Sequence, residues 1–108
     1  MILEHAVLRV IDGQSEQFEK DFRRAESIIS AAPGYLGHSL VRGIENPSQY
    51  LLLVKWTSLE DHIDGFRGSE PYQQWKALLH HYYEPFPKVE HFDLADTVSA
   101  QGYGLQLG

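Results

Sequence analysis

The chain has 108 residues, the size of one domain, and 43% of them are hydrophobic, which is typical of a globular protein. Nine Lys plus Arg against fifteen Asp plus Glu give a formal net charge of −6 at pH 7, and an acidic chain without a basic run is poorly suited to nucleic acid. The absence of cysteine excludes disulfides, cysteine-based zinc sites and a cysteine nucleophile.

The first half of the chain predicts a strand, a helix and two further strands. Residues 2–11 are aliphatic and β-branched and end at an Asp-Gly turn signal, which indicates a strand. Residues 15–32 predict a helix with Ser15 as its N-cap and a stripe of buried residues from Phe18 to Ile29. The charged residues of this helix, Asp21 among them, are expected on a solvated face. Strands are expected at residues 35–42 and 50–56.

The second half predicts two helices and a last strand. Ser58 is expected to cap a short helix over residues 58–66, and Ser69 a second helix that ends before Pro85. Apolar residues recur along the second helix at three- and four-residue spacing and form a strongly aromatic face: Tyr72, Trp75, Leu78, Leu79 and Tyr82. Residues 88–94 predict a strand, and residues 95–108 form a tail without a strong period.

This order of elements is the split βαβ pattern of ferredoxin-like α+β domains. It predicts one domain over residues 1–94, in which helices cover one face of an antiparallel sheet. Because the strand over residues 50–56 is apolar on both sides, the face without helices needs a cover. A second copy is the simplest cover, so we expect a homodimer with Leu51, Leu53 and Val7, or their neighbours of opposite parity, at the seam.

Several segments resemble the antibiotic biosynthesis monooxygenase domain family. They are EHAVLRV, PGYLGHSLVRGIENPSQYLLLVKW, WTSLEDHIDGFRGSEPYQQW and HHYYEPFPKVEHF, and the resemblance covers residues 1–94. It implies a dimeric α+β barrel with a ligand cavity between the sheet and the helices of each monomer. The family that these segments resemble includes monooxygenases that form quinones without metal, flavin or haem. It also includes small haem-degrading enzymes and members of unknown activity. By this resemblance no cofactor is expected.

The resemblance carries over to individual residues only in part. Trp56 and Ser58 match the family's common Trp-x-Ser, whereas Phe66 stands where many members have His or Trp. In the haem-degrading branch an Asn lies level with Ala6 and an axial His lies level with Lys76. Because the ligating positions differ here, we expect neither haem binding nor haem degradation.

His62 and Arg67 are the candidate catalytic residues. His62 lies one helical turn before Phe66 on roughly the same face, and an imidazole there could take the proton of a phenol or quinol. Arg67 could anchor the resulting anion at the mouth of a pocket. Both side chains could instead be solvated helix residues. The walls for a flat aromatic ligand would be Trp56, Phe66, Tyr72, Trp75 and Leu79, which could equally be core residues.

The remaining histidines suggest a metal site only weakly. His5, His62, His80 and His91 could in principle converge, but no pair has helical i,i+4 spacing and no carboxylate motif accompanies them. We therefore expect no metal site.

Two functions follow from the sequence. The first is a cofactor-independent monooxygenase that oxidises a small aromatic or quinol substrate with molecular oxygen, which requires an acid or base in the cavity. The alternative is a non-catalytic dimeric domain that binds small molecules or is associated with stress. No apolar run is long enough to span a membrane and the N-terminus does not read as a signal peptide, so a cytoplasmic location is expected.

Overall fold

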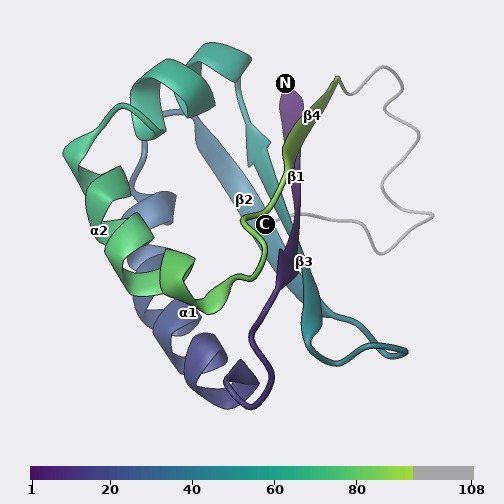
Figure 1. Cartoon of the computed structure of the whole chain (residues 1–108). Helices are drawn as coiled ribbons and strands as arrows, with labels where there is room; N and C mark the ends of the chain where they lie inside the picture. The colour runs from purple at the N-terminus through teal and green to yellow at the C-terminus, as the bar shows by residue number, and fades with distance from the viewer. Residues whose placement is uncertain (94–108) are drawn as a thin grey trace.

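The computed structural model of this protein describes residues 1–93 (Figure 1). The elements in chain order are β1 (Ile2–Arg9), α1 (Ser15–Ser30), β2 (Tyr35–Arg42), β3 (Gln49–Trp56), the π-helix η1 (Asp61–Phe66), α2 (Glu70–Leu79), the 3₁₀-helix η2 (His80–Tyr82) and β4 (Val89–Asp93). The predicted tail over residues 95–108, and the end of the last predicted strand at residue 94, lie outside the described residues.

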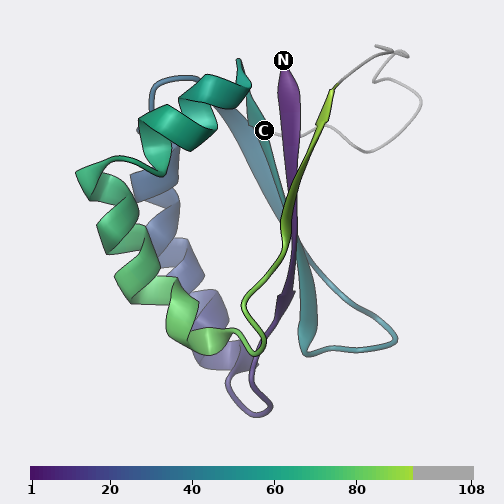
Figure 2. The same ribbon diagram turned by 45° about the horizontal axis from the view of Figure 1, so that its top comes forward.

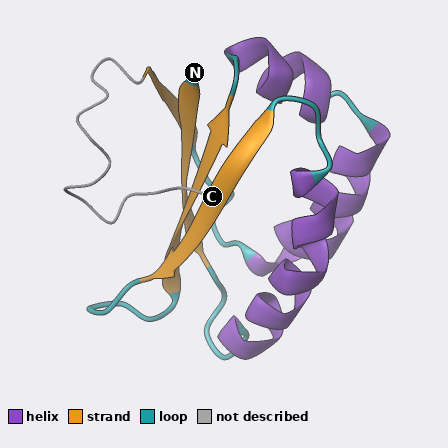
Figure 3. Cartoon of the chain, turned by 180° about the vertical axis from the view of Figure 1, so that it is seen from behind, coloured by secondary structure: helices purple, strands orange, loops and turns teal. Residues whose placement is uncertain are grey.

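The four strands form one antiparallel sheet in the order β2-β3-β1-β4, and the helices lie on one of its faces (Figure 2). This confirms the predicted ferredoxin-like arrangement. Strand alternation divides β1 between the two faces. Ala6 and Leu8 point toward the helices and are buried, whereas His5 and Val7 point away from them. The view from behind shows the sheet and the helix layer side by side (Figure 3).

The core lies between the sheet and α1 with α2. Phe18 is fully buried and packs edge-on against the rings of Tyr50 and Tyr82, at centroid distances of 5.0 and 5.6 Å. Edge-to-face contacts of this kind are the favoured geometry for aromatic rings. The predicted buried face of α1 and the aromatic face of α2 are thus confirmed as the two halves of one core.

The helix starts show which capping predictions were right. Ser58 and Ser69 cap as expected, because their hydroxyl oxygens accept hydrogen bonds from Asp61 N (3.1 Å) and Tyr72 N (3.3 Å). Ser15 was predicted wrongly, since it is the first helical residue and Gln14 occupies the cap position without a side-chain bond.

One further prediction needs correction, and one helix has an unexpected type. Asp21 is buried rather than solvated, and its carboxylate accepts a 2.5 Å hydrogen bond from the buried Tyr82 hydroxyl of η2. The predicted short helix is present, and its segment from Asp61 to Phe66 is a π-helix, with Arg67 N donating to His62 O at 2.9 Å. Such wider turns occur frequently at functional sites. No helix among the described residues has the length and apolarity needed to cross a bilayer.

Candidate functional site

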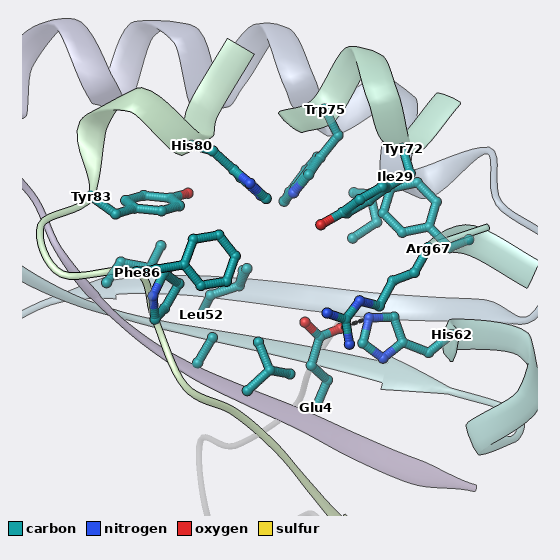
Figure 4. A pocket seen from close by; sticks show the side chains of 15 residues that line it. Glu4, Ile29, Leu52, His62, Arg67, Tyr72, Trp75, His80, Tyr83 and Phe86 are labelled. Atoms are coloured by element: carbon teal, nitrogen blue, oxygen red, sulfur yellow. Dashed lines mark ion pairs between the residues drawn. The ribbon is translucent and has the colours of Figure 1, made fainter. Parts of the chain in front are cut away.

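A small cavity lies between the sheet and the layer made by η1, α2 and η2 (Figure 4). Its space for the centres of water molecules is about 50 Å³, which corresponds to roughly four waters and therefore to a small ligand. The cavity has a polar end, with Glu4, His62 and Arg67, and an aromatic end, where His80, Tyr83 and Phe86 surround the space.

Glu4 supplies the carboxyl group of the polar end. The alternation of β1 points its side chain toward the helices, in line with Ala6 and Leu8, and only 6% of the residue is exposed. Its Oε1 accepts a 2.9 Å hydrogen bond from Trp56 Nε1 and lies 3.2 Å from His62 Nε2. A carboxyl group in this position is held by one donor from the sheet and one neighbour from η1.

His62 is held in place from both sides. Its ring stacks on the Trp56 indole, with 5.1 Å between centroids and 19° between planes. Its Nδ1 lies 2.8 Å from Nε2 of His91, which is the residue of β4 paired with Glu4 across the β1–β4 ladder. Glu4, His62 and His91 therefore form a continuous row of polar contacts that ends at the edge strand β4.

The polar end is arranged for proton transfer rather than for a fixed ion pair. Burial raises the pKa of Glu4 to about 7, and the Trp56 hydrogen bond and the Arg67 charge offset this only in part. Burial, together with His91 and Arg67, lowers the pKa of His62 to about 3. Although the atoms lie at ion-pair distance, His62 is thus neutral at pH 7, and Glu4 is close to half-ionised there.

Arg67 brings the positive charge to this end of the cavity. It follows η1 directly, and although the residue is largely exposed, its side chain lies beside Glu4 and His62 (Figure 4). Among residues 1–93 its guanidinium forms no ion pair within 4.0 Å. A guanidinium in this position suits a phenolate or carboxylate of a ligand, because it stays protonated and presents several donors in one plane.

The opposite end is walled by aromatic rings from α2, η2 and the segment before β4. Tyr72 and His80 meet edge-on at 5.8 Å, and His80 and Phe86 at 5.2 Å. Trp75 is buried behind them at 5% exposure. Phe86 is 61% exposed although it lines the cavity, so it forms the outer wall toward solvent.

The structure brings five of the seven predicted site residues to the cavity. His62, Arg67, Phe66, Tyr72 and Trp75 all line it. The other two lie in the core instead. Trp56 is fully buried behind the polar end, where it touches Glu4 and His62, and Leu79 is fully buried in the main core cluster.

Sequence reasoning missed Glu4, His80 and Tyr83 as cavity residues. For Glu4 a signal was present, because it is the one charged residue in the otherwise apolar alternate set Ile2, Glu4, Ala6 and Leu8. For His80 and Tyr83 the sequence contained no such signal, because their positions depend on the change from α2 to the tighter η2.

The structure also shows where the residues relevant to haem and metal binding lie. Lys76, level with the axial histidine of the haem-degrading branch, is exposed on α2 and does not line the cavity. Within the part of the chain that the structure describes, no three His, Cys, Asp or Glu side chains are grouped so that they could hold a metal ion. The residues present therefore offer no haem ligand at the expected position.

Comparisons with known proteins agree with this architecture. Residues 1–78 match the family model described as antibiotic biosynthesis monooxygenase. The uncharacterized protein YczJ of Bacillus subtilis (strain 168) is 54% identical over 92 residues, covering 85% of this chain and 97% of that protein. The structure of a proposed antibiotic biosynthesis monooxygenase from Bordetella bronchiseptica is similar with a TM-score of 0.82 and 33% identity, over 85% of this chain and 94% of the other.

A solved oxygenase shares the fold. SnoaB from Streptomyces nogalater, a cofactor-independent oxygenase whose structure was determined as a mutant, is similar with a TM-score of 0.77 over 91% of this chain and 96% of the other. At 17% identity this likeness concerns the fold alone.

Proposed function

We propose that this protein, which belongs to the antibiotic biosynthesis monooxygenase family, is a cofactor-independent monooxygenase that oxidises a small phenol or quinol with molecular oxygen. One observation carries the proposal above all. A buried carboxyl group with its pKa near 7 lies 3.2 Å from a neutral imidazole and beside a guanidinium, at one end of a cavity walled by aromatic rings.

The polar end supplies the proton acceptor. A phenol hydroxyl in the cavity transfers its proton to the Glu4 carboxylate, whose pKa near 7 suits a general base at neutral pH. His62 lies 3.2 Å from that carboxyl group and helps to hold it in place. The sequence pointed to His62 as the base, but a pKa of about 3 gives its imidazole little basicity, so the base is assigned to Glu4.

Arg67 and the aromatic walls handle the product of that proton transfer. The guanidinium stabilises the phenolate by charge, and the electron-rich ring then reacts with oxygen. For a phenol or quinol with a free para or ortho position, oxygen adds to that ring carbon, and the O–O bond and the ring C–H bond then break. One oxygen atom becomes the new quinone carbonyl, and the other leaves as water with the ring hydrogen. Glu4 returns its proton to the departing oxygen, so the base is regenerated and the atoms balance.

The test is oxygen uptake with 1-naphthol in the presence of a metal chelator and without added flavin. We expect one water and one 1,4-naphthoquinone for each oxygen molecule, with the new carbonyl labelled by isotopic oxygen gas. His62→Ala should lower turnover by roughly 10²-fold, at the low end for the loss of an acid–base group, because Glu4 loses its partner. His81→Ala is the matched control, since His81 is an exposed histidine away from the cavity.

Two outcomes would contradict the proposal. Turnover that stops on chelation would point to a metal instead. Binding of 1-naphthol without oxygen uptake would favour the alternative, a non-catalytic domain that binds small aromatic molecules.

A further inference from the structure

We infer that His80 is a specificity-determining residue, which selects ligands that carry a hydrogen-bond donor at the end of the ring opposite to the hydroxyl held by Glu4. The inference rests on the proposed function, because it assumes that an aromatic ligand lies in this cavity with a hydroxyl at Glu4. It adds the residue that distinguishes between the two ligands of that proposal: a ring with polar groups at both ends, such as a para-diol, is bound in preference to a simple phenol.

The first observation is a nitrogen atom without a partner. His80 Nδ1 is buried from solvent and has no hydrogen-bond partner among the described residues. Leaving a buried polar atom unpaired is unfavourable, and most such atoms in proteins are paired. A ligand atom in the adjacent cavity is one way to satisfy it.

The second observation is the chemical state of the ring. Burial, with Lys76 and Arg67 as further causes, lowers the pKa of His80, so the imidazole is neutral at pH 7. A neutral imidazole has one nitrogen that donates and one that accepts. The side chain can therefore accept a hydrogen bond from a ligand hydroxyl, which a protonated histidine could not.

The third observation is the placement of His80. Its ring points into the cavity from the end of α2, between Trp75 and Tyr83, while Glu4 and Arg67 approach from the other end (Figure 4). Tyr72, Tyr83 and Phe86 lie around the ring at centroid distances of 5.8, 5.9 and 5.2 Å. In this apolar surrounding a single hydrogen bond discriminates strongly between ligands, because water does not compete for it.

The experiment compares two ligands of the same size under anaerobic conditions, hydroquinone and 4-methylphenol, by calorimetric titration. Both have a hydroxyl for Glu4, but only hydroquinone has a donor for His80. We expect the wild-type protein to bind hydroquinone about tenfold more tightly, in line with one additional buried hydrogen bond. His80→Phe should remove this preference by weakening hydroquinone alone, and His80→Gln, which retains an acceptor, should restore part of it.

His81→Phe is the control, because it changes an exposed neighbour that does not line the cavity. Equal affinity of the two ligands for the wild type, binding of neither, or a preference that survives in His80→Phe would overturn the inference. The proposed function is tested apart from it, by oxygen uptake with 1-naphthol, which has no donor at the far end. If the preference for hydroquinone depends on His80 but no oxygen uptake occurs, the proposed function is contradicted and the role of His80 in specificity still holds.

Discussion

At the scale of single residues, the site depends on two neighbouring groups that burial affects in opposite senses. Glu4 is an acid, so burial raises its pKa, whereas His62 is a base, so burial lowers its pKa. His62 is consequently neutral at pH 7, whereas Glu4 easily gains or loses one proton near that pH. A single charged substrate group or the nearby Arg67 can then decide where that proton lies.

The raised pKa of Glu4 predicts how stability depends on pH. The folded protein binds this proton with a pKa of about 7, against 4.5 for the ordinary group, so folding stability falls as pH rises through this window and stays low above it. Across this pH window, the free energy of unfolding of the wild type should fall by about 3 kcal/mol relative to that of Glu4→Gln, which cannot titrate. Each pKa unit corresponds to about 1.4 kcal/mol. Urea denaturation of both proteins at pH 5 and pH 8 measures this difference.

The Gln variant is a close match in shape, and its side-chain oxygen can still accept from Trp56 Nε1. A stability difference between the two proteins that is the same at both pH values would show that the Glu4 carboxyl group does not titrate as described.

Individual site residues were predictable only where the pattern of one element was enough. The helical spacing of His62 and Phe66 placed both at the cavity, but the partners of His62 come from strands 58 and 29 residues away in sequence. The capping motif gave no sign of the π-helical turn. Trp56 was predicted to form a ligand wall, but its indole turns toward Glu4 instead. That conformation depends on packing between distant segments, which no local sequence pattern shows.

At the scale of elements, η1 is positioned by the turn that ends α1. Gly34 has a φ of +86°, and a β-carbon there would meet the Asp61 carboxylate at a distance that real β-carbons do not show. Asp61 also accepts a hydrogen bond from the Thr57 hydroxyl, and Thr57 N donates to Gly34 O at 2.9 Å. The turn and the start of η1 thus form one packed unit directly before His62.

Alanine substitutions at two glycines separate backbone strain from this contact. Gly13 has nearly the same φ, +85°, but open space where its β-carbon would stand. Gly13→Ala should cost about 1–2 kcal/mol, from the left-handed conformation alone. Gly34→Ala should cost clearly more, because Asp61 must also move. Chemical denaturation of the two variants provides the comparison, and equal losses would mean that the turn does not hold η1.

At the scale of the whole molecule, one face of the sheet is left apolar. Val41 and Phe92, on the face away from the helices, are each 48% exposed, and Val7 and Leu51 lie paired between them. Contiguous apolar surface of this kind usually marks an interaction site. We propose that a second copy of the chain covers it, in a homodimer with the two sheets packed face to face.

The dimer predicts the effect of a charge on that face. Leu51→Asp should both dissociate and unfold the protein, because Leu51 is partly exposed in one copy and the dimer would bury the new carboxylate without a partner, which costs several kcal/mol. Ile44→Asp is the control, since Ile44 is 89% exposed in the turn between β2 and β3. Sedimentation velocity at micromolar concentration is the measurement, and a monodisperse wild-type monomer would refute the dimer.

The fold was more predictable than the site, for a physical reason. Each strand and helix is encoded by its own periodicity, and the order of the elements leaves few ways to build one sheet with helices on one face. The cavity instead depends on where residues such as His80 and Phe86 come to rest after a change of helix type and an irregular segment. Their side chains are set by packing across the molecule rather than by neighbours in sequence.

The most direct test of the account is the pH dependence of kcat/KM for oxygen uptake with 1-naphthol, in the wild type and in Glu4→Gln. If Glu4 is the base, the wild-type rate should rise with pH along a limb centred near 7. That limb should be absent in the variant, with kcat/KM lower by roughly 10²–10⁴-fold. The same profile and rate in both proteins, or no oxygen uptake by the wild type at any pH, would contradict the claim that this cavity carries out proton abstraction for oxygen chemistry.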